Sequence, residues 1–122
     1  MEVLALVCSV ALAVVAMVSG VPKVQLQGQP WTFLRDRGVS AKGSRAIGLT
    51  ELTCVVLLMV GLFWRPAGVL AAAVLLGMFT WAVRFHFRHG DYENPDMRAP
   101  AFLTLGIAVG CLLTLAALLA AA

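Results

Sequence analysis

Four long apolar stretches limit what this chain can fold into. A membrane-spanning helix needs roughly 20 mainly apolar residues, and the sequence reaches or approaches that length over residues 3–21, 46–63, 67–89 and 100–122. Only 12% of the residues are charged and 61% are hydrophobic. A soluble domain carries about 25% charged residues, and a small globule cannot bury so much apolar surface. The sequence therefore predicts an all-α fold: a single domain over residues 1–122 that forms an integral membrane, antiparallel four-helix bundle.

The connections refine this prediction. Only Trp64-Arg65-Pro66 separates the second and third stretches, and so short a link predicts an antiparallel hairpin. The first loop is turn-rich and then places Trp and Phe beside Arg, a composition typical of the headgroup zone. We expect a short interfacial helix near residues 31–37, ended by Gly38. Ser40 or Ser44 would cap the next helix.

The basic residues predict the orientation in the membrane. Residues 22–45 and 84–99 hold eight of the nine Lys and Arg residues, and Arg65 is the ninth. The positive-inside rule places both loops in the cytoplasm and both termini outside, in a multi-pass protein of the cell membrane. The same distribution makes the lipid bilayer the expected partner and argues against nucleic acid. The residues before the first stretch include no Lys or Arg, which argues against a cleaved signal peptide.

Small residues recur at spacings typical of helix packing in membranes. Gly106 and Gly110 form a GxxxG pair, and Gly77 follows the alanines at 71–73. Such residues let helix backbones approach closely. The sequence leaves open whether this face packs inside the bundle, against a second copy or against another membrane protein.

The sequence contains no recognisable metal or cofactor motif. Its three cysteines, Cys8, Cys54 and Cys111, fall in different apolar stretches and form no CxxC pair. His86 and His89 share a helix face, but flanking arginines disfavour a cation there. We therefore expect no metal ligands and no bound cofactor.

Glu51 is the strongest candidate for a functional residue. It lies six residues after Arg45, about 9 Å into the second helix, where a carboxylate must pair, become protonated or face a polar cavity. The end of the third helix is level with it, so Arg84 or His86 can be its partner, and the sequence does not choose between them. We predict Glu51 and His86 as catalytic residues. The predicted binding residues are Arg84, Trp81, Thr50, Arg88 and Asp91.

These residues carry a resemblance to a known family. Ile47-Gly48-x-x-Glu51 at the start of an apolar helix, the short Trp-Arg-Pro hairpin, and His86-x-x-x-Gly90-Asp91 resemble the DoxX-like membrane proteins over about residues 42–118. The resemblance implies a four-helix membrane bundle, with Glu51 and His86 at the family's polar helix positions. The family name derives from a subunit of a thiosulfate:quinone oxidoreductase, and some relatives assist assembly of other membrane proteins.

Two functions follow as hypotheses. In the first, a polar site near the cytoplasmic leaflet binds a lipophilic or quinone-like small molecule as part of a membrane oxidoreductase system, with Glu51 exchanging a proton. In the second, the chain is a non-enzymatic subunit, assembly factor or scaffold that docks a second copy or another membrane protein. The sequence does not decide whether the protein is an enzyme.

Overall fold

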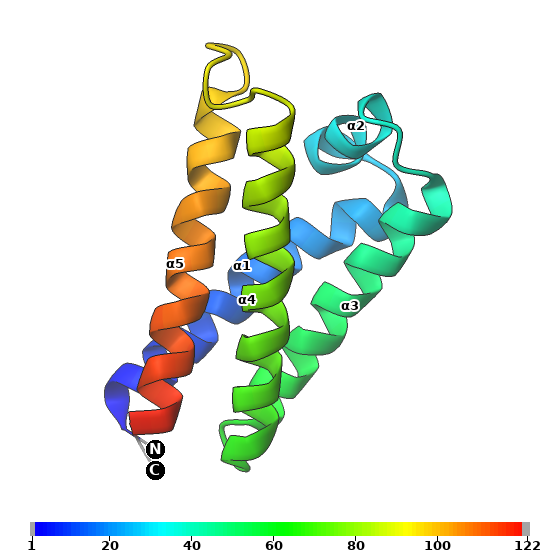
Figure 1. Cartoon of the computed structure of the whole chain (residues 1–122). Coiled ribbons are helices and arrows are strands. Elements are labelled where there is room, and N and C mark those ends of the chain that lie inside the picture. The colour runs from blue at the N-terminus through cyan, green and yellow to red at the C-terminus, as the bar shows by residue number, and fades with distance from the viewer. Residues whose placement is uncertain (1, 121–122) are drawn as a thin grey trace.

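The computed structural model describes residues 2–120 and is helical almost throughout. Four long helices form the bundle within this range: α1 (Val3–Gln25), α3 (Ala41–Val60), α4 (Arg65–Arg88) and α5 (Arg98–Ala120). All four are long and apolar enough to cross a membrane. A short fifth helix, α2 (Gly28–Asp36), lies across one end (Figure 1). The predicted all-α membrane bundle is therefore confirmed.

The helix bounds differ from the predicted ones where polar residues belong to a helix. α1 continues through Pro22 to Gln25, four residues beyond the predicted end. α3 begins at Ala41, five residues before the predicted start, because Ser40 caps it: its hydroxyl accepts a 3.0 Å hydrogen bond from the amide of Gly43. The predicted end of the last helix, at residue 122, lies outside the described residues.

The long helices alternate in direction and pack in pairs. α1 packs chiefly against α3, α4 packs chiefly against α5, and the tight α3–α4 turn joins the pairs. The start of α1, the end of α5 and this turn lie at the same end of the bundle (Figure 1). Away from the α3–α4 turn, α3 and α4 diverge. The short helix α2 lies at this end of the bundle (Figure 1).

Glycines set the closest helix contacts, but not the glycines that the sequence suggested. A Cβ atom added to Gly61 would lie 2.5 Å from the Cα of Gly68, across the α3–α4 turn. One added to Gly48 would lie 2.7 Å from the carbonyl oxygen of Gly20, so α1 and α3 touch through their backbones. By contrast, Cβ atoms added at positions 77, 106 and 110 would meet nothing within 4 Å. The predicted GxxxG pair therefore makes no close helix contact within residues 2–120.

The short helix α2 covers the open end of the bundle. The sequence predicted a helix at residues 31–37, and α2 begins three residues earlier and ends at Asp36. Gly38 follows with a φ of +86°, a conformation that glycine adopts without strain. The inward side of α2 carries Leu34, which is buried, and Phe33, which contacts α4. α2 is therefore packed onto the bundle.

Candidate functional site

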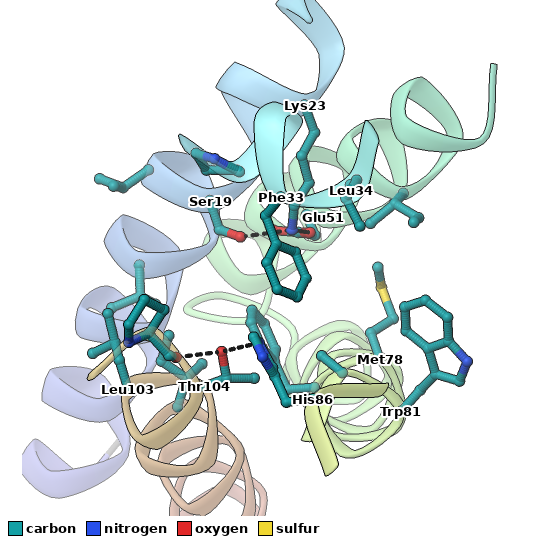
Figure 2. A pocket seen from close by; sticks show the side chains of 18 of the residues that line it. Ser19, Lys23, Phe33, Leu34, Glu51, Met78, Trp81, His86, Leu103 and Thr104 are labelled. Atoms are coloured by element: carbon teal, nitrogen blue, oxygen red, sulfur yellow. Dashed lines mark hydrogen bonds and ion pairs between the residues drawn. The ribbon is translucent and has the colours of Figure 1, made fainter. Parts of the chain in front are cut away.

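A large cavity lies below α2, between the α1–α3 pair and the α4–α5 pair. Its volume is about 1220 Å³, and all five helices contribute to its wall. Most of the wall is apolar, including Val18 of α1, Met78 of α4 and Leu103 of α5. Two polar groups interrupt it, one around Glu51 and one around His86 (Figure 2).

The first polar group is an ion pair between α1 and α3. The Lys23 ammonium donates to Glu51 Oε1 over 2.5 Å and to the Ser19 hydroxyl over 2.9 Å. Glu51 is 1% exposed. Its second oxygen, Oε2, is buried and has no hydrogen-bond partner among the described residues. Glu51 is among the residues that line the cavity, so its carboxylate lies at this wall with one oxygen unused by the described residues.

This pair corrects the prediction that Arg84 or His86 neutralises Glu51. Because Gly48 and Gly20 have no side chains, α3 lies against the backbone of α1 at this point. Glu51 of α3 therefore lies next to Lys23, near the end of α1. Arg84 lies on the exposed face of α4. The predicted helix ends at residue 21, which leaves Lys23 in the loop, whereas α1 continues to Gln25.

The second polar group is a chain of hydrogen bonds centred on Asp91. This carboxylate is 1% exposed and accepts from Arg37 Nη2 over 2.8 Å. Its other oxygen lies 2.7 Å from His86 Nδ1. An ionised carboxylate can only accept, so His86 carries its proton on Nδ1. In the neutral ring Nε2 is then an acceptor, 3.3 Å from the hydroxyl of Thr104 on the cavity wall, which donates to the carbonyl of Pro100 over 3.0 Å.

Aromatic rings tie α2 to this second group. The centroids of the Phe33 and His86 rings lie 4.5 Å apart, and the guanidinium carbon of Arg37 lies over the Phe33 ring, 3.9 Å from its centroid. Tyr92 approaches His86 edge-on at 6.4 Å. Burial, and to a smaller extent the Asp91 carboxylate, raise the pKa of Tyr92, so its hydroxyl stays protonated. Arg37 and Phe33 together hold α2 over the cavity (Figure 2 shows the Phe33 ring).

Comparison with known proteins assigns the family. The family model described as the DoxX-like family matches residues 7–111, which is most of the chain. The chain belongs to the DoxX-like family. The match begins within α1 and ends at residue 111, so it adds α1 and α2 to the residues 42–118 on which the sequence resemblance rested, and it stops seven residues short of their end. Comparison with curated proteins and with solved structures gives no match.

The structure of this DoxX-like protein brings some of the predicted site residues together and leaves others apart. Glu51, His86 and Trp81 line the cavity, and Asp91 supports His86 from behind. Three predicted residues do not line it and are exposed: Thr50, Arg84 and Arg88. The Thr50 hydroxyl bonds to the carbonyl of Ala46 in its own helix.

The sequence analysis missed two cations that pair with buried carboxylates in this chain. Lys23 and Arg37 were counted with the first loop and read only as orientation signals. Each is the partner of a buried carboxylate: Glu51 for Lys23 and Asp91 for Arg37. Two facts could have pointed to these cations. A buried carboxylate needs a cation as its partner, and the first loop supplies most of the basic residues of the chain.

Proposed function

We propose that this DoxX-like protein binds a lipophilic molecule with a small polar head, of the quinone or quinol class, in the cavity below α2. The supporting observation is a mostly apolar cavity whose wall carries two separate buried polar groups. Ligand pockets usually have a few polar groups in an apolar lining and a volume of roughly 300–1,000 Å³. At about 1220 Å³ the cavity accommodates a ring together with part of an apolar tail.

The Glu51 wall suits the oxygens of such a head group. Glu51 Oε2 can accept a hydrogen bond from a quinol hydroxyl. An ammonium has three N–H donors, and Lys23 uses two of them on Ser19 and Glu51, so the third can donate to a quinone carbonyl. This wall can therefore bind both the oxidised and the reduced head group.

The His86 wall offers a second contact. Asp91 fixes the His86 ring, and Nε2 faces Thr104 on the cavity wall. A quinone ring with oxygens at opposite positions could place one oxygen at the Glu51 wall and the other at the His86 wall. On reduction Glu51 and His86 can donate the two protons while a redox partner protein supplies the two electrons, and on oxidation they can accept the protons while the partner takes up the electrons.

The cavity is open at its side, which suits a ligand that arrives through the bilayer. Val14 and Val18 of α1 and Leu103 of α5 line the cavity, yet they are 58%, 70% and 66% exposed. The opening therefore lies between α1 and α5, on the apolar surface of the bundle. The positive-inside rule places this end at the cytoplasmic leaflet, with both long loops in the cytoplasm.

Calorimetric titration of the purified protein in detergent with a short-chain 1,4-benzoquinone and its quinol tests this proposal. We expect Glu51→Gln to weaken quinol binding by roughly tenfold or more, since hydrogen bonds to charged groups contribute about 1.5–3 kcal/mol. Glu93→Gln, in the exposed loop before α5, is the matched control and should bind as the wild type does. A folded Glu51→Gln protein with unchanged affinity for both compounds would contradict the proposal.

One observation favours a second candidate, a non-enzymatic membrane subunit or assembly factor. The Gly106 and Gly110 face of α5 has room for added side chains and contacts no other described helix closely. Under this alternative the face docks a second copy or another membrane protein. Gly106→Leu with Gly110→Leu would then abolish cross-linking or co-purification of the partner, whereas Glu51→Gln would leave it intact.

A further inference from the structure

The outer face of α4 carries a second polar site, apart from the hydrogen bonds of the cavity. A hollow of about 220 Å³ is lined by Trp81, Arg84, Phe85 and Arg88. Their spacings of three and four residues place all four on one side of the helix. The hollow lies in the last two turns of α4, which ends at Arg88. It is therefore at the level where the apolar span meets the basic loop.

The two arginines of this hollow are not neutralised by the protein. Within residues 2–120, neither Arg84 nor Arg88 has a carboxylate within 4.0 Å, whereas Arg37 pairs with Asp91. Like charges four residues apart on a helix repel each other. An anion between the two guanidinium groups would remove this repulsion, and guanidinium groups bind phosphate oxygens in a bidentate manner.

Aromatic rings form the floor of the hollow and hold it in place. The Phe85 ring contacts the Trp81 ring at 5.1 Å, the His89 ring at 4.4 Å and the Phe33 ring of α2 at 5.7 Å. Trp81 is 50% exposed, and Phe87 nearby is 75% exposed. An amphiphilic anion can therefore place its charge between the arginines and its chains along exposed aromatic surface. Trp at this depth is also typical of the headgroup zone.

We propose that this hollow binds the phosphate of an anionic phospholipid. The lipid's phosphate lies between Arg84 and Arg88, and its acyl chains pass Trp81 toward the bilayer centre. Two features favour a lipid over a free phosphate ion: the exposed apolar surroundings, and the position of Arg84 one turn inside the span. The hollow shares the Trp81 side chain with the cavity, but the two arginines that would hold the phosphate line only the hollow, so the proposal does not depend on the cavity ligand.

Native mass spectrometry of the detergent-purified protein tests the site. Phosphatidylglycerol and phosphatidylcholine with identical acyl chains are added in turn, and bound lipid is counted. We expect wild-type protein to retain phosphatidylglycerol preferentially. Arg84→Gln with Arg88→Gln should weaken this retention by roughly thirtyfold, the effect expected from two basic residues near an anionic lipid surface. Equal retention of both lipids by the wild type would overturn the proposal.

Two controls separate this site from general attraction to positive charge. Lys42→Gln with Arg98→Gln removes the same charge from the same end of the bundle, at exposed positions outside the hollow, and should keep phosphatidylglycerol binding. Loss of binding in this control to the same extent would overturn the proposal. In a third titration, inorganic phosphate replaces lipid. Specific binding of phosphate without phosphatidylglycerol binding would identify a soluble ion as the ligand and exclude the lipid site.

Discussion

The two ends of this bundle differ in how the helices are held together. At the end with the α3–α4 turn, the buried side chains are apolar and small or branched, such as Ala5, Leu58, Ala72 and Leu118, all fully buried. At the end covered by α2, the buried groups include two carboxylates, Glu51 and Asp91, each paired with a partly buried cation. The first end is closely packed, and the second contains the cavity.

This difference follows from the solvent. In a bilayer, moving an apolar side chain from lipid into the protein interior gains little free energy, because lipid tails are equally apolar. Helices therefore associate through close packing and polar contacts. The tight α3–α4 turn, with Gly61 on Gly68, closes one end by packing alone. At the other end a few polar contacts tie the helices together and keep them apart enough for a cavity. The bundle can therefore be stable and still contain a cavity, because close packing lies at one end and the cavity at the other.

The largest effect should come from breaking the buried ion pair at the open end. Lys23→Ala leaves the Glu51 carboxylate in the interior without a cation, and stripping one member of a buried pair costs about 3–5 kcal/mol. Glu51→Gln should cost less, because an amide keeps the shape and can still accept a hydrogen bond from Lys23. Unfolding in mixed micelles with increasing sodium dodecyl sulfate measures both free energies.

The matched control for Lys23→Ala is Arg84→Ala. Arg84 is exposed and has no ion pair within the described residues, so its removal should change the free energy of unfolding by less than about 0.5 kcal/mol. The sequence offered Arg84 as one of two possible partners of Glu51, and with that pairing Arg84→Ala would leave the carboxylate without a cation. Equal destabilisation by both variants would restore that pairing and contradict the structure.

A smaller effect is expected from filling a glycine contact at the closed end. In Gly61→Ala the new methyl group would collide with the backbone of Gly68, since the two atoms would be 2.5 Å apart. Overpacking of this kind costs about 1–3 kcal/mol. Gly106→Ala has open space around it and should stabilise α5 by up to about 1 kcal/mol. Thermal unfolding in detergent compares the two, and equal effects would show that the turn end is not closely packed.

The fold was predictable from the sequence because membrane spans follow from length and apolarity alone. The four spans and the short helix at α2 were all expected, and only their ends moved. The ends were wrong where a helix runs on into polar residues, as α1 does at Lys23 and α3 does from Ala41. Apolarity marks the lipid-facing part of a helix, whereas caps and packing set its actual end.

The site was only partly predictable, because helix rotation is absent from a hydropathy pattern. Depth placed Glu51 and His86 at one level, and both line the cavity. Which helix Glu51 faces depends on the contact between Gly48 and Gly20, and nothing in the pattern marks Gly20 as the partner of Gly48. The same missing information made the exposed Arg84 look buried. A single sequence gives the depth of a residue in a span more readily than its direction.

The smallest predicted effect concerns the cover of the open end. Phe33→Leu removes the ring that contacts His86 and lies below the Arg37 guanidinium, while Leu34 and the Arg37–Asp91 pair keep α2 in place. Aromatic contacts contribute about 0.5–1.5 kcal/mol, so local opening of α2 should rise roughly fivefold with little change in global stability.

Hydrogen exchange of the backbone amides reports this opening directly. Amides of α2 (Gly28–Asp36) should exchange faster in Phe33→Leu, while those of α4 and α5 keep their wild-type rates. Phe63→Leu is the control, because Phe63 lies in the turn at the closed end, is 93% exposed and should leave α2 unaffected. Faster exchange throughout the bundle would mean that Phe33 stabilises the whole fold. Unchanged exchange in α2 would mean that the ring does not hold the cover at all, and the contrast between a closed end and an openable end would then rest on the ion pairs alone.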